Sequence, residues 1–184
     1  TQHPTYDVFS GSDDIPREEA RAKLGMGPGP LCLFFGLVRK YKRLEDLIEA
    51  IAKLQGPDAP RLLVAGEFYD PVARYEELIA RLGLGGRVTL VDRYIPNEEV
   101  ALYFRAADVL IAPYRTDSQS GVVRIANAFA LPVIVSNVGG LPEMVQPGQT
   151  GLVVPAESPD ALAAAIRRFF SENLATRFAP HLAR

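Results

Sequence analysis

The segment LCLFFGLVRKYKRLEDLIEAIAKL, residues 31–54, decides the fold class. Its first seven residues, 31–37, are apolar apart from one glycine, which is typical of a strand that is covered on both faces of a sheet. After a basic loop, residues 44–54 repeat apolar side chains at the three- and four-residue spacing of an amphipathic helix. The segment therefore predicts a buried strand followed by a helix.

The same alternation continues through most of the chain. Further strands are expected at residues 61–65, 87–91, 109–112, 133–136 and 152–154, and helices at residues 73–82, 98–106, 122–129 and 159–170. Alternating strands and helices imply a parallel sheet with right-handed crossovers and helices on both faces. We therefore predict an α/β, doubly wound Rossmann-like domain over residues 31–170.

Two segments flank this domain. Residues 1–30 are rich in Pro, Gly, Ser and Asp and contain one helical pattern, at residues 17–24, so we predict a linker or entry segment. Residues 171–184 are predicted to form a C-terminal helical segment, which would approach a second domain outside this chain.

The composition excludes several classes of protein. The chain has 184 residues, 48% of them hydrophobic, which suits one substantial core. Its net charge is −2 and its cations are spread out, which argues against a nucleic-acid partner. No apolar run approaches the ~20 residues that cross a bilayer, and we predict no transmembrane segment and a cytoplasmic location. Cys32 is the single cysteine and is expected in the core.

A basic loop follows the first predicted strand. Parallel sheets bind ligands beyond the carboxyl ends of their strands, and Arg39, Lys40 and Lys42 lie at such an end. Gly36 would let backbone approach a ligand, while Arg39 offers a planar fork of donors and Lys42 a mobile point charge, a pair suited to a diphosphate. The alternative is an ordinary solvated basic loop.

A second polar stretch, residues 114–123, separates the fourth predicted strand from the next helix. Ser120 or a neighbour can cap this helix, and amides near Gly121, Val122 and Val123 would face an anion with the helix dipole behind them. The alternative is ordinary helix capping. Gly66, at the end of the second predicted strand, is compatible with a simple turn.

The sequence lacks the residues that several classes of enzyme and metal-binding protein need. The two histidines, His3 and His181, lie near opposite ends of the chain and belong to no cluster with metal-ligand spacing. There is no Asp-any-Asp pair, and the Gly-any-Gly-any-any-Gly turn of a dinucleotide-binding domain is absent after residues 31–37. We therefore predict neither a metal site nor a bound cofactor, and disfavour a dehydrogenase.

Together these loops resemble the carboxyl-terminal domain of the retaining, GT-B-type family 4 glycosyltransferases (glycosyl transferases group 1), as found in bacteria. Residues 128–134, 138–143 and 148–153 match that family's order and spacing, and the resemblance covers roughly residues 31–170. It implies that the domain is one half of a GT-B fold.

The resemblance also implies roles for individual residues. The implied catalytic residues are Arg39, Lys42 and Asp117. Arg39 and Lys42 would hold the donor diphosphate, and Asp117 is a carboxylate where the family has a glutamate. Ile125 replaces a second glutamate and cannot accept hydrogen bonds from ribose hydroxyls, and Arg43 stands where glycine is usual.

The resemblance also places two residues beside the nucleotide base, Tyr94 and Ile95. Ordinary core packing is the alternative for Ile95. The implied donor-binding set is Gly36, Gly66, Tyr94, Ile95, Ser118, Gln119, Ser120, Gly121, Val122, Val123 and Ile125.

The resemblance therefore implies that the chain is the donor-binding domain of a retaining glycosyltransferase. The enzyme would transfer a sugar from a nucleoside diphosphate (NDP)-sugar to an unidentified acceptor, and UDP or GDP is the favoured nucleotide. The departing diphosphate would assist deprotonation of the acceptor without a metal. The missing amino-terminal, acceptor-binding domain would be a partner, so the isolated domain is expected to be inactive. The full-length enzyme would be cytoplasmic, at the inner membrane face.

Three other functions are kept as alternatives. They are a non-catalytic nucleotide- or sugar-phosphate-binding module, a nucleotide-sugar epimerase of the same architecture, and a scaffold that binds no nucleotide.

Overall fold

The computed structural model describes residues 14–116 and 120–182, which build one six-stranded parallel sheet. The strands run in the order β3-β2-β1-β4-β5-β6, and every neighbouring pair is parallel. Their bounds are β1 Leu31–Phe35, β2 Arg61–Gly66, β3 Val88–Asp92, β4 Val109–Ala112, β5 Val133–Ser136 and β6 Gly151–Val154. This confirms the predicted α/β, doubly wound Rossmann-like fold.

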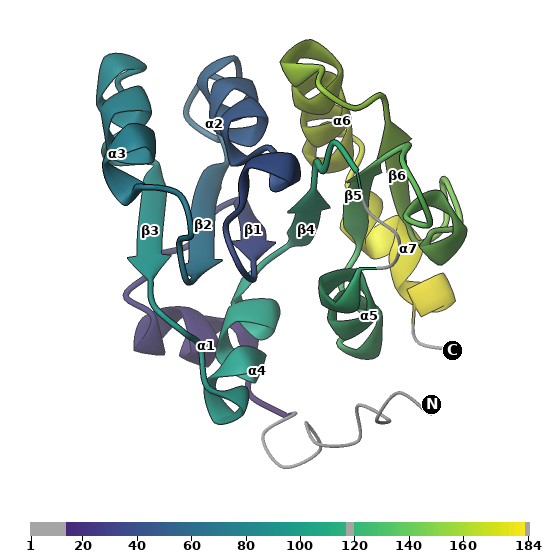
Figure 1. Cartoon of the computed structure of the whole chain (residues 1–184). Helices are drawn as coiled ribbons and strands as arrows, with labels where there is room; N and C mark the ends of the chain where they lie inside the picture. Colours follow the sequence, from purple (N-terminus) through teal and green to yellow (C-terminus); the bar gives the residue numbers. More distant parts are fainter. Residues whose placement is uncertain (1–13, 117–119, 183–184) are drawn as a thin grey trace, which may run out of the picture.

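Helices cover both faces of the sheet (Figure 1). Their bounds are α1 Arg17–Lys23, α2 Leu44–Ala52, α3 Val72–Arg81, α4 Asn97–Ala106, α5 Gly121–Ala128, α6 Pro159–Ser171 and α7 Leu174–Leu182, with short 3-10 turns η2 Lys40–Lys42 and η3 Pro142–Met144. On one face α2 packs against α3 and α6, and α1, α4 and α5 lie on the other (Figure 1). The sheet is therefore the middle of three layers. None of these helices is long and apolar enough to cross a membrane.

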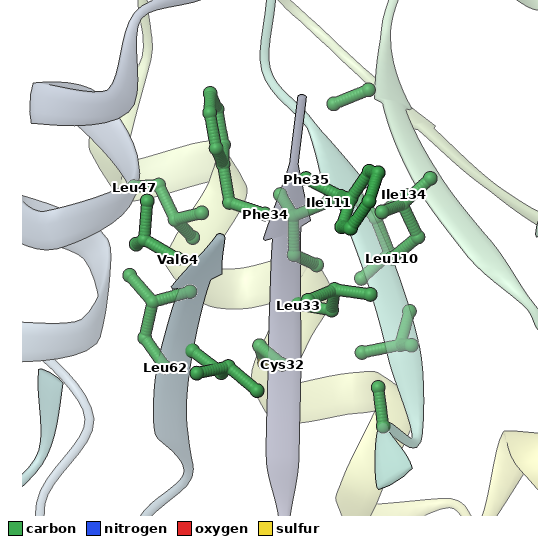
Figure 2. Packing of buried hydrophobic residues seen from close by; sticks show 14 of the residues in the cluster. Cys32, Leu33, Phe34, Phe35, Leu47, Leu62, Val64, Leu110, Ile111 and Ile134 are labelled. Atoms are coloured by element: carbon green, nitrogen blue, oxygen red, sulfur yellow. The ribbon is translucent and has the colours of Figure 1, made fainter. Parts of the chain in front are cut away.

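The centre of the core is β1. All five of its residues are buried, and Figure 2 shows its side chains between those of β2 and β4. Phe35 packs edge-on against Phe104 of α4, with ring centroids 4.9 Å apart. Cys32 is fully buried, as predicted, and this burial raises the pKa of its thiol.

The first strand is shorter than the sequence pattern predicts. It ends at Phe35, and Gly36 adopts a φ of 107°, which directs the backbone out of the sheet. Leu37, expected in the strand, instead lies in the loop and is 36% exposed. Hydrophobicity alone does not distinguish these positions, so the strand boundary was wrong by two residues.

Within the segment predicted as a linker, residues 17–23 form α1, which packs against α4. The buried Arg21 side chain makes the connection: its Nε donates to the carbonyl of Ala106 at 2.8 Å and its Nη2 pairs with Asp108 at 3.1 Å. At the other end of the domain, Phe178 of α7 is buried and its ring centroid lies 6.5 Å from that of Phe169 in α6. Both terminal helices are docked on the domain.

Candidate functional site

The order of the strands reverses direction between β1 and β4, which places a topological switch point there. The loop after β1 leads to α2 on one face of the sheet, and the loop after β4 leads to α5 on the other (Figure 1). Because these loops part at the carboxyl ends of the strands, a crevice is expected between them, and ligands of open α/β sheets bind in it. Among the described residues, the sequence-predicted site residues follow β1 (Gly36, Arg39 and Lys42), end β2 (Gly66), follow β3 (Tyr94 and Ile95), or cap and begin α5 (Ser120, Gly121, Val122, Val123 and Ile125).

Two glycines let the loops after β1 and β2 approach closely. Gly36 donates its amide to the carbonyl of Ala65 at 2.9 Å. Gly66 has a φ of 148°, and a Cβ built on it would lie 1.9 Å from the carbonyl oxygen of Gly36. Gly66 is therefore required by backbone packing, apart from any contact with a ligand.

Lys42 is folded back over the end of β1. It ends the η2 turn, and its side chain is buried although it carries a charge. A Cβ built on Gly36 would lie 3.4 Å from Lys42 Nζ and 3.1 Å from Cγ2 of Val122. Lys42 Nζ, the Gly36 backbone and the first turn of α5 therefore meet at the switch point, although they come from distant parts of the chain.

Arg39 has different surroundings from Lys42. It is exposed, and its guanidinium carbon lies 4.4 Å from the centroid of the Tyr69 ring, in the loop after β2. Backbone hydrogen bonds from Val38 to Glu67 (2.9 Å) and from Tyr69 to Val38 (3.0 Å) hold the two loops together. The Arg39–Tyr69 contact is thus a cation–π pair on a fixed loop framework.

Arg43 is held in an ion pair and adds no further cation to this site. It has φ 54° and ψ 45°, the left-handed conformation for which glycine is favoured. Its guanidinium binds Asp46 through two hydrogen bonds of 2.9 Å and Glu45 at 3.0 Å. The hydrogen bonds that the guanidinium donates to Asp46 raise its pKa. This ion pair at the start of α2 explains how arginine is accommodated in a glycine-like conformation.

Ser120 caps α5, as predicted. It is buried, and its Oγ accepts a hydrogen bond from the amide of Val123 at 3.2 Å. That amide is therefore used by the cap, and Gly121 and Val122 supply the preceding amides of the first turn. Asp117, Ser118 and Gln119 lie outside the described residues.

The remaining predicted residues have contrasting environments. Tyr94 is 67% exposed just beyond β3, whereas Ile95 is buried in the core. Ile125 lies on α5, partly buried against the core. Of these three, Tyr94 alone presents a large open face to a ligand.

Sequence reasoning missed the contribution of Tyr114. Only 2% of this residue is exposed, and its ring centroid lies 5.4 Å from Lys42 Nζ. The available signal was a single aromatic residue in a loop of small polar side chains. Its partner is about seventy positions away in the chain, so no local pattern could identify the contact.

Two further observations concern the rest of the described chain. A cavity of about 800 Å³ is lined by Pro30, Pro60 and Phe170, where β1 and β2 begin. It therefore lies at the amino-terminal edge of the sheet, away from the switch point. Within residues 14–116 and 120–182, no group of three or more His, Cys, Asp and Glu side chains is placed to hold a metal ion.

Comparisons with known proteins identify the family. The model of the family described as "Glycosyl transferases group 1" matches residues 29–172. A D-inositol 3-phosphate glycosyltransferase of Corynebacterium glutamicum is 34% identical over 177 residues, which are 91% of this chain and 41% of that protein. The chain thus spans less than half the length of this relative.

Solved structures agree with this assignment. A sucrose-phosphate synthase from Thermosynechococcus elongatus superposes with a TM-score of 0.78 at 33% identity, over 91% of this chain and 44% of that one. The C-terminal domain of a Francisella tularensis glycosyl transferase group 1 protein shares the fold, with a TM-score of 0.78 at 22% identity over 89% and 87% of the two chains. The chain belongs to the glycosyl transferases group 1 family and has the Rossmann-like fold of one domain of a GT-B glycosyltransferase.

Proposed function

We propose that this chain is the donor-binding domain of a retaining glycosyltransferase, and that the diphosphate of an NDP-sugar binds at the switch point between β1 and β4. The observation that carries the proposal is the buried Lys42 side chain, whose Nζ lies beside the Gly36 backbone and near the start of α5. A buried ammonium beside a helix N-terminus attracts a phosphate through its charge and through the helix dipole.

Lys42 and the first turn of α5 would stabilise the charge that develops on the leaving diphosphate. Donors fixed in advance in a water-poor crevice contribute several kcal/mol to such a step. No metal is needed by this arrangement, and the departing diphosphate would itself assist deprotonation of the acceptor. Asp117 is proposed as the carboxylate beside the donor sugar.

Arg39 would join Lys42 at the diphosphate by leaving the Tyr69 ring. An exposed cation–π pair contributes about 0.5–1 kcal/mol. Hydrogen bonds that involve a charged group contribute about 1.5–3 kcal/mol, so a bidentate contact between arginine and phosphate is the stronger of the two. The exchange is therefore favourable once the donor is bound.

The nucleoside would extend from the switch point towards β3. Adjacent strands lie about 4.8 Å apart, so β1 and β3 are separated by about 10 Å, a span that suits a nucleoside diphosphate. Tyr94, exposed at the end of β3, is proposed to pack on the base, with UDP or GDP as the nucleotide.

The proposed enzyme needs a second domain. The chain covers 41% of the Corynebacterium glutamicum relative, which supports a separate amino-terminal domain that binds the acceptor. We therefore expect donor binding but no transfer by this chain alone, and a cytoplasmic location for the whole enzyme. A non-catalytic binding module is the alternative, since Ile125 provides no oxygen for ribose hydroxyls. Sugar transfer by the two-domain protein would exclude that alternative.

The proposal is tested by titrating the chain with UDP and with GDP in a calorimeter. Lys42→Met removes the charge at nearly constant length, and Lys40→Met is the matched control because Lys40 is exposed on the same η2 turn. We expect one nucleotide to bind, Lys42→Met to weaken it by tenfold or more, and Lys40→Met to change it less than twofold at moderate salt. Binding of neither nucleotide, or equal loss in both variants, would contradict the proposal.

A further inference from the structure

We propose that Tyr114 is a positioning residue that holds the Lys42 ammonium in place for the diphosphate. The inference rests on the function proposed for Lys42. Because only 2% of Tyr114 is exposed, the side chain acts through Lys42 and not by touching the donor.

The Tyr114 ring is fixed by two other aromatic rings. Phe34 of β1 lies edge-on to it, with centroids 6.5 Å apart and planes at 72°. Tyr41 of η2 lies at 6.1 Å and 76°. Two edge-to-face contacts from different elements determine the plane of the ring, and therefore the face over which Lys42 Nζ lies at 5.4 Å.

The backbone around Tyr114 is also anchored on two sides. The amide of Arg115 donates to the carbonyl of Tyr41 at 2.7 Å, which joins the loop after β4 to the η2 turn. The hydroxyl of Ser136, fully buried at the end of β5, donates to the carbonyl of Tyr114. The ring is thus held by β1, η2 and β5 before any ligand is present.

This arrangement reduces the freedom of Lys42. A lysine stem has many rotamers, and a group that is already ordered loses less entropy when its ligand binds. The negative face of an aromatic ring attracts an ammonium, more strongly where water is excluded. Removing the π face while keeping the volume should therefore weaken diphosphate binding by about 5- to 30-fold, whereas removing only the hydroxyl should not.

The test is a double-mutant cycle on the whole chain, with UDP, GDP and inorganic pyrophosphate as ligands. Tyr114→Leu and Tyr114→Met both remove the π face, so that one of them can replace the other if it unfolds, and Tyr114→Phe retains the face. We expect a 5- to 30-fold loss of affinity for the first two and less than twofold for Tyr114→Phe. In a Lys42→Met background, Tyr114→Leu should cause less than a twofold further loss. The same loss in both backgrounds, or no loss in either, would overturn the proposal.

A second readout needs no ligand. With lysine side chains labelled and the Lys42 signal assigned from its absence in Lys42→Met, the ε-methylene protons of Lys42 should be shifted upfield by the Tyr114 ring. The shift should persist in Tyr114→Phe and disappear in Tyr114→Leu. An unshifted signal in the unmodified chain would overturn the positioning role. Failure of the unmodified chain to bind any nucleotide while the shift is present would instead contradict the proposed function.

Discussion

The carbonyl oxygen of Gly36 occupies the space in which a Cβ of residue 66 would lie, with only 1.9 Å between the oxygen and such an atom. Gly66 also has a φ of 148°, which side chains rarely adopt. Together the contact and the backbone angle bring the loops after β1 and β2 into one framework, on which Arg39 and Lys42 are carried.

Gly66→Ala should therefore destabilise the fold by more than backbone strain alone. Gly56 is the matched control, because its φ of 115° is also positive but open space surrounds it. Strain contributes about 1–3 kcal/mol at either position, and Gly66→Ala must in addition displace the Gly36 backbone. We expect a clearly larger loss of unfolding free energy for Gly66→Ala in urea denaturation. Equal losses would show that the close approach is not limiting.

Arg43 permits a prediction with two substitutions at one position. Arg43→Ala removes the hydrogen bonds to Asp46, each worth about 1.5–3 kcal/mol when a charge is involved, and keeps the left-handed strain. Arg43→Gly loses the same bonds but relieves the strain, so it should be about 1 kcal/mol less destabilising than alanine. Thermal and urea unfolding measure the order. If the Arg43→Ala variant is as stable as the Arg43→Gly variant, the left-handed backbone at this position costs no folding free energy.

We expect the docking of α1 to depend more on Arg21 than on Arg17, although both pair with Asp108. Arg21 is 8% exposed, and burial lowers the pKa of its guanidinium while Asp108 opposes that shift. Arg21→Ala should cost about 2–3 kcal/mol of unfolding free energy because it leaves the buried carbonyl of Ala106 without this donor and removes the bonds to Gly29 and Asp108. Arg17→Ala breaks an exposed pair and should cost less than about 1 kcal/mol. A similar cost for both would contradict the greater role of the buried Arg21.

The buried thiol of Cys32 reports on folding and predicts how the stability of the chain depends on pH. Burial raises its thiol pKa in the folded state, so the folded chain disfavours the thiolate. This contribution to the unfolding free energy is fully present below the unfolded thiol's pKa of about 8.5. It is lost as the pH rises above that value, because the unfolded chain then releases the thiol proton more readily than the folded chain. We expect Ellman's reagent at pH 8 to react only at the rate of unfolding, and quickly in urea. Rapid reaction with the folded chain would contradict the buried position.

The fold is predictable from the sequence because the patterns that specify strands, helices and caps are local. Apolar runs such as residues 109–112 and 133–136 coincide with β4 and β5, and Ser120 caps α5 as its side-chain chemistry predicts. The end of β1 was not predictable from hydrophobicity, since Leu37 is as apolar as the strand that precedes it.

Long-range contacts explain what the sequence did not reveal. Arg21 binds residues more than eighty positions away, which no periodicity encodes. Lys42 was predicted as a site residue from the basic loop, whereas its position over Tyr114 depends on the pairing of β1 with β4. The roles of Asp117, Ser118 and Gln119 stay predictions, because these residues lie outside the described part of the chain.

The proposed diphosphate site is tested most directly by mapping where a nucleoside diphosphate binds. The isotopically labelled chain would be titrated with UDP and GDP while its backbone amide signals are recorded by NMR. We expect the largest shifts at Gly36, Lys42 and Val122, at the switch point. Shifts concentrated instead at the opposite edge of the sheet, around Lys53 and Phe170 in the cavity there, would contradict the proposed site, as would the absence of shifts with either nucleotide at millimolar concentration.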